Sequence, residues 1–203
     1  MEDLLQSPVA LFIFVLTIAT SLIAWQYEDL FRLFALNPWS LVREQKYYTL
    51  LTCGLVHANG MHLAFNMFSF YYFAFPLEQL IGHWQFLVLY VASLVLSDIT
   101  TVVKHRDTPE YFCVGASGAV TAVIFSLILY VPKATLYVFG VLPMRMWLFG
   151  IVFVLYSYYS SRYRQTRVNH AAHLWGAISG IALTLILDPR ACRIFLNTLQ
   201  LTS

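Results

Sequence analysis

Charged residues are scarce in this chain. They make up 11% of its 203 residues, whereas an average soluble domain has about 25%. Hydrophobic residues make up 60% of the chain, and the mean hydropathy is +0.69. This composition excludes an ordinary soluble domain and indicates a protein that resides in a lipid bilayer.

Features of several other protein classes are also missing. The net charge is only +2, with no run of Lys or Arg longer than two residues, so we expect no nucleic-acid partner. Cys53, Cys113 and Cys192 are scattered and odd in number, which gives neither a disulfide framework nor metal-ligand spacing. We therefore expect no metal and no cofactor. The chain begins MEDLLQSP, which is acidic where a secretory signal is basic, so the first apolar block is predicted to be a retained helix.

The apolar residues fall into six blocks. A helix that crosses a bilayer needs about 17–25 mainly apolar residues. We predict an all-α polytopic membrane protein, a single membrane domain over residues 1–203, with spans at about 8–25, 59–81, 83–103, 117–131, 146–160 and 169–187. The fourth block is too short to cross a core of about 30 Å at 1.5 Å per residue. It is predicted to be a short central helix that starts below the membrane surface, where residues 111–116 dip in to meet it.

Alternating spans bring the polar residues of this chain together. The linkers 26–58, 104–116 and 161–168 all fall on one side, which we call the loop face. Spans two, four and six begin there, and their first turns carry His62 and Asn66, Ser117, and His170 and His173. Polar side chains inside a bilayer are costly, so several at one depth indicate a functional site.

Small residues favour close contact between spans four and six. Ser117 lies between Ala116 and Gly118, and Gly176 and Gly180 are four residues apart in span six. Such small faces let two membrane helices approach closely. A close approach of these two spans would set Ser117 against His173.

These residues suit acyl transfer by a serine. A neutral His within hydrogen-bond reach activates a serine nucleophile, and Asn side chains and backbone N–H groups hold a developing oxyanion. We therefore predict Ser117 as nucleophile, His173 as general base and Asn66 as oxyanion donor. His62 and His57 are expected to help near the same oxygen.

Other arrangements of the same residues stay open at this point. Asp98 lies toward the loop face and is a candidate to orient His173, and His62, His170 and His173 are a candidate metal site. The hydrolase motif G-x-S-x-G is excluded because residue 119 is Ala. A zinc protease motif H-E-x-x-H is absent, since residues 62–66 read HLAFN.

Three motifs together resemble the rhomboid intramembrane serine proteases. They are HANGMHLAFNM at 57–67, GASGAV at 115–120 and AHLWGAISG at 172–180, in the family's order. The resemblance implies a six-helix fold in which Ser117 and His173 form a dyad without an acid. It implies that Asn66, His62 and the Ser117 N–H line the oxyanion region, with His57 and Gly115 in support.

The resemblance also implies substrates and a location. The expected partners are the lipid bilayer and single-span membrane proteins, cut in or beside a transmembrane segment that small residues weaken. The expected location is a bacterial inner membrane, with the site toward the extracytoplasmic side. The motifs depart from the family at Thr121, where many bacterial members carry an aromatic residue.

Two questions remain open from the sequence. The first question concerns function, for which two alternatives stay open. One is a rhomboid-like adaptor that binds transmembrane helices without cutting them, and the other is a small channel or metal carrier. The orientation is also contested, because the loop face carries more basic residues than the other face: Arg32, Arg43, Lys46, Lys104, Arg106, Arg162, Arg164 and Arg167 against Lys133, Arg145, Arg190 and Arg193. The positive-inside rule predicts a cytoplasmic loop face, whereas the resemblance implies an external one.

Overall fold

Six long helices form the body of the protein in a computed structural model that describes residues 5–138, 140–163 and 169–200. They are α2 (Pro8–Ala24), α6 (Gly60–Ile81), α7 (His83–His105), α8 (Ser117–Tyr130), α9 (Met146–Tyr163) and α10 (His170–Leu187). Each lies where the sequence predicts a span, and the largest difference is the longer C-terminal end of α9. The mainly helical fold is thereby confirmed.

Length and composition distinguish these helices. In the part of the chain that the structure describes, α7 and α10 are long and apolar enough to cross a membrane, whereas α2 and α8 are apolar but shorter. α8 has 14 residues, which agrees with the predicted short central helix. The six crossings themselves stay a prediction.

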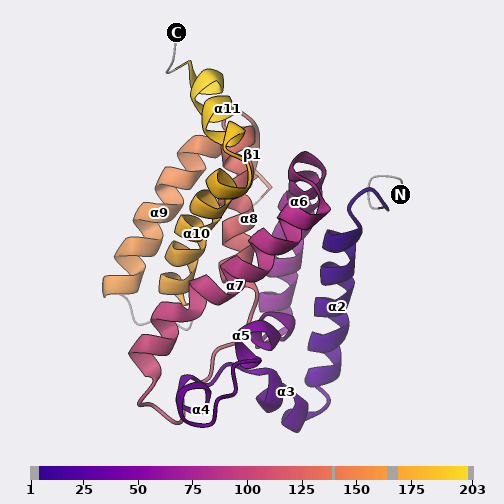
Figure 1. Cartoon of the computed structure of the whole chain (residues 1–203), viewed down its shortest axis with the longest axis vertical. Coiled ribbons are helices and arrows are strands. Elements are labelled where there is room, and N and C mark those ends of the chain that lie inside the picture. The colour runs from indigo at the N-terminus through magenta and orange to yellow at the C-terminus, as the bar shows by residue number, and fades with distance from the viewer. Residues whose placement is uncertain (1–4, 139, 164–168, 201–203) are drawn as a thin grey trace.

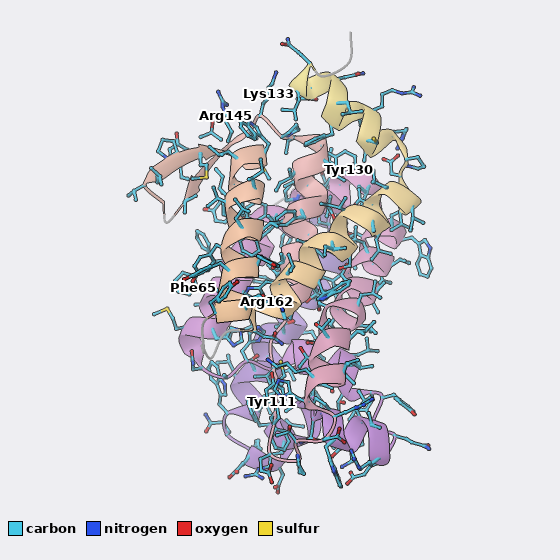
Figure 2. All side chains as sticks on the ribbon, turned by 90° about the vertical axis from the view of Figure 1, so that its left-hand side faces the viewer. Phe65, Tyr111, Tyr130, Lys133, Arg145 and Arg162 are labelled. Carbon is cyan, nitrogen blue, oxygen red and sulfur yellow. The ribbon has the colours of Figure 1, made fainter. Side chains whose placement is uncertain are left out.

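The three helices with the predicted site residues start at one end of the bundle. α6, α8 and α10 all begin near the end that holds the short helices α3 (Glu28–Phe34), α4 (Pro38–Arg43) and α5 (Thr49–Thr52) and the 3₁₀ turn η1 (Cys53–Leu55) (Figure 1). This end is the loop face. Figure 2 shows Tyr111 at this end, with Lys133 and Arg145 at the opposite one. Arg164 and Arg167 lie outside the described residues.

α8 lies at the centre of the bundle. Every residue of α8 after Ser117 is buried, and α6, α7, α9 and α10 pack around it. A helix that is apolar all round is expected to be enclosed in this way. The enclosure holds the N-terminal end of α8, and with it Ser117, inside the protein.

Two elements correct the prediction of a purely helical chain. Strands β1 (Thr135–Val138) and β2 (Leu142–Arg145) form an antiparallel hairpin in which Thr135 pairs with Arg145. β-branched and aromatic residues favour these strands, and Gly140 takes a positive φ of 75° in the turn. Helix α11 (Arg190–Leu199) follows Pro189 and was also not predicted. Both segments are too short to stand out as apolar blocks.

A buried carboxylate ties the start of α2 to the end of α6. Glu78 is fully buried and accepts hydrogen bonds from the backbone N–H groups of Val9 at 3.1 Å and Ala10 at 2.7 Å. Its Oε1 also lies 2.6 Å from Nδ1 of His83. The first N–H groups of a helix lack intrahelical partners, and a negative charge there is favourable. Glu78 therefore caps α2 from another helix.

We expect Glu78→Gln to lower the stability of the protein. The amide has one acceptor oxygen instead of two and no charge, so a buried N–H of α2 is left unsatisfied, at a cost of about 1–3 kcal/mol. Thermal unfolding of the detergent-solubilised variant measures this loss. Glu110→Gln is the control, because Glu110 is exposed. Equal melting temperatures for the two variants would contradict the capping role.

Candidate active site

Ser117 is the first residue of α8 and is half-buried at the loop-face end of the bundle. The backbone N–H groups of the first helical turn have no intrahelical acceptor, so the Ser117 N–H is available to a bound group. The loop before it is extended and hydrogen-bonded to other segments. Cys113 exchanges two backbone hydrogen bonds of 2.9 Å with Leu36, and the Gly115 N–H donates to the Cys53 carbonyl at 2.9 Å. Such pairing is what non-helical backbone at membrane depth requires.

His57 holds this loop from the linker before α6. Its Nε2 accepts from the Ala116 N–H at 3.4 Å, and its Nδ1 lies 3.1 Å from Ser21 Oγ, which donates to the Leu55 carbonyl at 3.1 Å. These partners assign the Nδ1–H tautomer, with Nδ1–H donating to Ser21. Both ring nitrogens are then occupied, so His57 supports the loop rather than donating to an oxyanion.

Burial keeps His57 neutral. Desolvation, with a smaller contribution from neighbouring His62, lowers the pKa of His57 from 6.5 to about 3. The unfolded chain takes up a proton on this residue below about pH 6.5, whereas the folded protein does so only near pH 3. Acidification through this window therefore favours the unfolded state.

We expect His57→Gln to flatten the acid side of the stability profile. The variant is less stable than wild type at pH 8 because the hydrogen bonds of the loop are disturbed. The difference narrows as the pH falls from 6.5 toward about 3, by up to about 1.4 kcal/mol per pH unit. Unfolding free energies in detergent at several pH values measure this. Parallel profiles for variant and wild type would contradict it.

His62 packs directly against the loop before Ser117. A Cβ at Gly115 would lie 2.8 Å from Nε2 of His62, and Gly115 has a φ of 115°. Only glycine suits this position, because a side chain would both strain the backbone and displace the ring. The ring centroids of His57 and His62 are 4.9 Å apart. His62 and Gly115 are thereby brought to the start of α8, as predicted.

Asn66 lies one helical turn after His62 and is buried. Its Nδ2 donates to the His62 carbonyl at 3.0 Å. That bond uses one of the two amide hydrogens, so the other remains available as a donor. Asn66 is thus equipped for the oxyanion role that the sequence predicts.

Glycines bring α8 and α10 into backbone contact. A Cβ at Gly176 would collide with the Gly118 carbonyl oxygen, and one at Gly180 with the Ala122 carbonyl oxygen. A Cβ at Gly118 would lie 3.5 Å from the Ala172 carbonyl oxygen. Gly118 and Ala172 are the chain neighbours of Ser117 and His173. The predicted close approach of these two helices is confirmed, and it sets the two residues on facing helix starts.

Ser117 and His173 are not hydrogen-bonded to each other among the described residues. Catalytic hydrogen bonds are often long in a protein without substrate and tighten on binding. Two rings border His173: that of Phe153 in α9, with centroids 6.0 Å apart, and that of His170, at 5.8 Å. The Thr121 hydroxyl donates back to the Ser117 carbonyl at 2.8 Å. Phe153, from another helix, therefore supplies the aromatic contact that Thr121 does not.

Asp98 has a different partner from the one considered above. It is buried in α7 and accepts from the Cys53 thiol at 3.6 Å. Over residues 5–138, 140–163 and 169–200, no three His, Cys, Asp or Glu side chains are arranged to hold a metal ion. The groups gathered at the start of α8 are thus a serine, histidines and amide donors.

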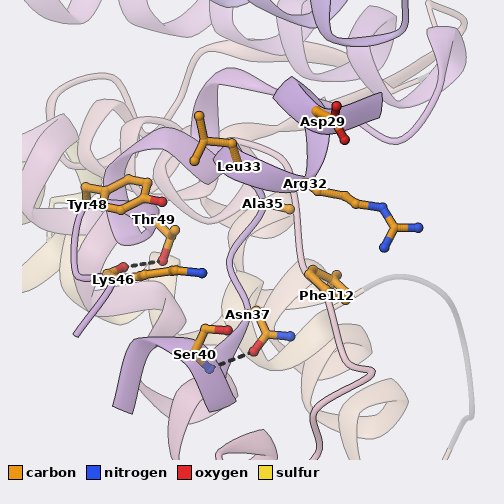
Figure 3. Close-up of a pocket in the computed structure, with 10 residues that line it drawn as sticks. All are labelled: Asp29, Arg32, Leu33, Ala35, Asn37, Ser40, Lys46, Tyr48, Thr49 and Phe112. Carbon is orange, nitrogen blue, oxygen red and sulfur yellow. Dashed lines mark hydrogen bonds between the residues drawn. The ribbon is translucent and has the colours of Figure 1, made fainter. Parts of the chain in front are cut away.

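A pocket of about 320 Å³ opens elsewhere on the loop face, between α3, α4, α5 and Phe112 (Figure 3). Its two cations are already paired: Arg32 with Glu28 and Lys46 with Glu44, both at 2.7 Å. None of the predicted site residues lines it. It is separate from the Ser117 site.

A family model and several known proteins that resemble this chain all point to one family. The model of the Rhomboid domain matches residues 44–190. The protein YdcA of Bacillus subtilis is 32% identical over 146 residues, which cover 71% of this chain and 69% of YdcA. Rhomboid protease AarA of Providencia stuartii is 24% identical over 181 residues, 80% of this chain and 64% of AarA. Inactive rhomboid protein 1 of Drosophila melanogaster is 29% identical over 150 residues, which span 70% of this chain but only 10% of that protein.

Proposed function

This chain belongs to the rhomboid family, and we propose that it is an intramembrane serine endopeptidase with Ser117 and His173 as its catalytic dyad. The observation that carries the proposal is the backbone contact of α8 and α10 at Gly118 and Gly176. This contact supports the proposal because it brings together the helix starts that carry the serine and the histidine, in a protein of a membrane-embedded family.

In the first step, Ser117 Oγ attacks the carbonyl carbon of the scissile peptide bond. His173 accepts the hydroxyl proton as the new C–O bond forms, and the carbonyl oxygen becomes an oxyanion. The Ser117 N–H, the second amide hydrogen of Asn66 and the His62 ring are the proposed donors to this oxyanion. His57 and Gly115 support them by holding the loop and the ring.

In the second step, the tetrahedral species collapses. His173 gives its proton to the leaving nitrogen, the C–N bond breaks, and the acyl group stays on Ser117 as an ester. His173 then accepts a proton from water as the water oxygen attacks the ester carbon. His173 returns this proton to Ser117 Oγ as the C–O bond to Ser117 breaks, which releases the second product as a carboxylic acid and restores both residues. In place of a third, acidic member, the Phe153 and His170 rings border His173.

The proposed substrates are single-span membrane proteins. A peptide bond reaches a serine at a helix start only when its backbone is extended, so segments with small or helix-weakening residues inside or beside the bilayer suit the site. Six membrane-crossing helices, an external loop face and a bacterial inner membrane complete the proposal. A reporter fused after Ser203 tests the orientation: a cytoplasmic signal supports an external loop face, and an external signal contradicts it.

Two assays on the purified protein test the function. A fluorophosphonate serine probe is expected to label the wild-type protein in detergent, with the adduct on the peptide that contains Ser117. A single-span model substrate in liposomes is expected to be cut in or beside its transmembrane segment, as mapped by mass spectrometry. A folded sample that neither reacts with the probe nor cuts the substrate would contradict the proposal.

A non-cleaving adaptor for transmembrane helices is the second candidate. It is favoured by the lack of a hydrogen bond between Ser117 and His173 among the described residues and by the family's inactive member in Drosophila melanogaster. An adaptor would retain the model substrate in a pull-down from detergent without cutting it, and Ser117→Ala would retain it equally.

A further inference from the structure

One side chain at the start of α10 joins three parts of the protein. Asn169 precedes α10, and its Oδ1 accepts from the Ala172 N–H at 3.1 Å, which caps the helix. Its Nδ2 donates to Thr101 Oγ1 in α7 at 2.7 Å and to Cys113 Sγ at 3.8 Å. The amide therefore links α10 to α7 and to the loop before α8.

The far ends of these bonds are themselves fixed. Thr101 is buried in α7, and Cys113 is held by its two backbone bonds to Leu36. Burial raises the pKa of the Cys113 thiol to about 12, so Cys113 is a neutral thiol and a weak sulfur acceptor. The stronger bond, to Thr101, thus sets the position of the amide, and the sulfur contact adds to it.

The positions of these residues relate the bonds to the candidate site. Asn169 lies four residues before His173, and Cys113 lies four residues before Ser117. Contacts at Gly118 and Gly176 set how close α8 and α10 come. A hydrogen bond from Ser126 of α8 to the Gly180 carbonyl at 3.2 Å joins the two helices further from the site, so the bonds of Asn169 act at the end of α10 that carries His173. Because no hydrogen bond joins Ser117 to His173 among the described residues, surrounding contacts must hold the two in register.

We propose that Asn169 is a positioning residue, whose amide clamps α10 to α7 and to the Cys113 loop and so sets the approach of His173 to Ser117. The inference rests on the proposed function for its effect on catalysis. A displacement of about 1 Å between reacting groups can lower a rate by about a hundredfold. Loss of the clamp therefore reduces the rate of the chemical step more than it reduces stability.

Variants that keep the helix cap isolate the clamp. Ser caps helices as well as Asn, but it carries no amide hydrogens to reach Thr101 and Cys113. We expect Asn169→Ser to lower the maximal rate of fluorophosphonate acylation about ten- to hundredfold, with the half-saturating probe concentration unchanged. Asn169→Asp is expected to slow acylation less, because the Thr101 hydroxyl can donate to its carboxylate.

Asn59 provides the matched control. It caps α6 by accepting from the His62 N–H at 2.9 Å, and its amide donates no hydrogen bond within the described ranges. Asn59→Ser and Asn59→Asp are expected to label at close to the wild-type rate, with melting temperatures similar to those of the Asn169 variants. Acylation of Asn169→Ser at the rate of Asn59→Ser would overturn the clamp.

Thr101→Val removes the other partner without changing its shape. It is expected to slow acylation to a similar degree, and the double variant Asn169→Ser with Thr101→Val to be no slower than the slower single variant, since both changes break the same bond. If the double variant is instead acylated more slowly by the product of the two single effects, the two residues do not act through a shared bond.

A cross-linking measurement separates the clamp from the proposed function. In the variant with Ser117→Cys and His173→Cys, a disulfide oxidant such as oxidised glutathione joins the two thiols and is itself reduced to two thiols. We expect the cross-link to form several-fold more slowly when Asn169→Ser is added, whether or not the wild-type protein is a protease. An unchanged cross-linking rate would overturn the inference. If cross-linking is slowed but the wild-type protein is not labelled by the fluorophosphonate, only the proposed function is overturned.

Discussion

Ser117→Ala is expected to abolish fluorophosphonate labelling and to lower substrate cleavage at least about 1,000-fold. His173→Ala is expected to cause a similar loss, because a serine hydroxyl is a poor nucleophile until a base accepts its proton. The double variant should be no worse than either single one, since the two residues act as a unit. Labelling rates and cleavage of the single-span substrate in liposomes measure all three variants.

Matched controls come from the same helices. Ser179 in α10 donates to the Gly176 carbonyl of its own helix at 3.0 Å and lies away from the helix start, so Ser179→Ala should keep its labelling. Labelling that persists in Ser117→Ala would show that the probe reacts with another residue. A larger loss of function in His62→Ala and His170→Ala than in Ser117→Ala would contradict the dyad and favour the histidine channel or metal carrier.

The long helices could be predicted because their cause is local. Each is a block of apolar residues of sufficient length, and the shortness of α8 follows from Pro132 and the polar loop before Ser117. The hairpin of β1 and β2 and the amphipathic helix α11 were missed. Neither has an apolar block long enough to be predicted as a span, and each depends on local turn geometry, such as Gly140 in the hairpin and Asp188 accepting from the Arg190 N–H at 3.1 Å.

The positions of the candidate site residues could be predicted from motif spacing and alternating helices, but several of their contacts could not. His57 is predicted to help near the oxyanion, but its hydrogen bonds to Ser21 and to the Ala116 N–H could not be read from the motif. Phe153 reaches His173 from α9, and Asn169, one turn before His173, bonds to Thr101 of α7; no spacing rule reveals either contact. An Asn before an apolar helix does predict a cap, and that signal could have drawn attention to Asn169.

Gly176→Ala is expected to be among the most damaging single-methyl additions in the protein. The new Cβ would meet the Gly118 carbonyl group, whose carbon would lie 3.0 Å away. Backbone cannot rotate aside as a side chain can, so α8 and α10 must separate. We expect a loss of about 1–3 kcal/mol of stability and, because Ser117 and His173 move apart, a fall in acylation of about a hundredfold.

Gly150→Ala in α9 is the comparison that isolates this contact. Its Cβ would lie 3.1 Å from Cδ1 of Ile128 and 3.5 Å from Cε1 of Phe125, which are ends of side chains that can shift. Both substitutions gain the same helix propensity, about 1 kcal/mol in favour of Ala, so the difference between them reports the backbone collision. Thermal unfolding and labelling rates should show Gly150→Ala close to wild type and Gly176→Ala impaired in both. A stable, fully labelled Gly176→Ala would mean that the two helices do not need backbone contact for the site to form, and the geometric support for the dyad would be lost.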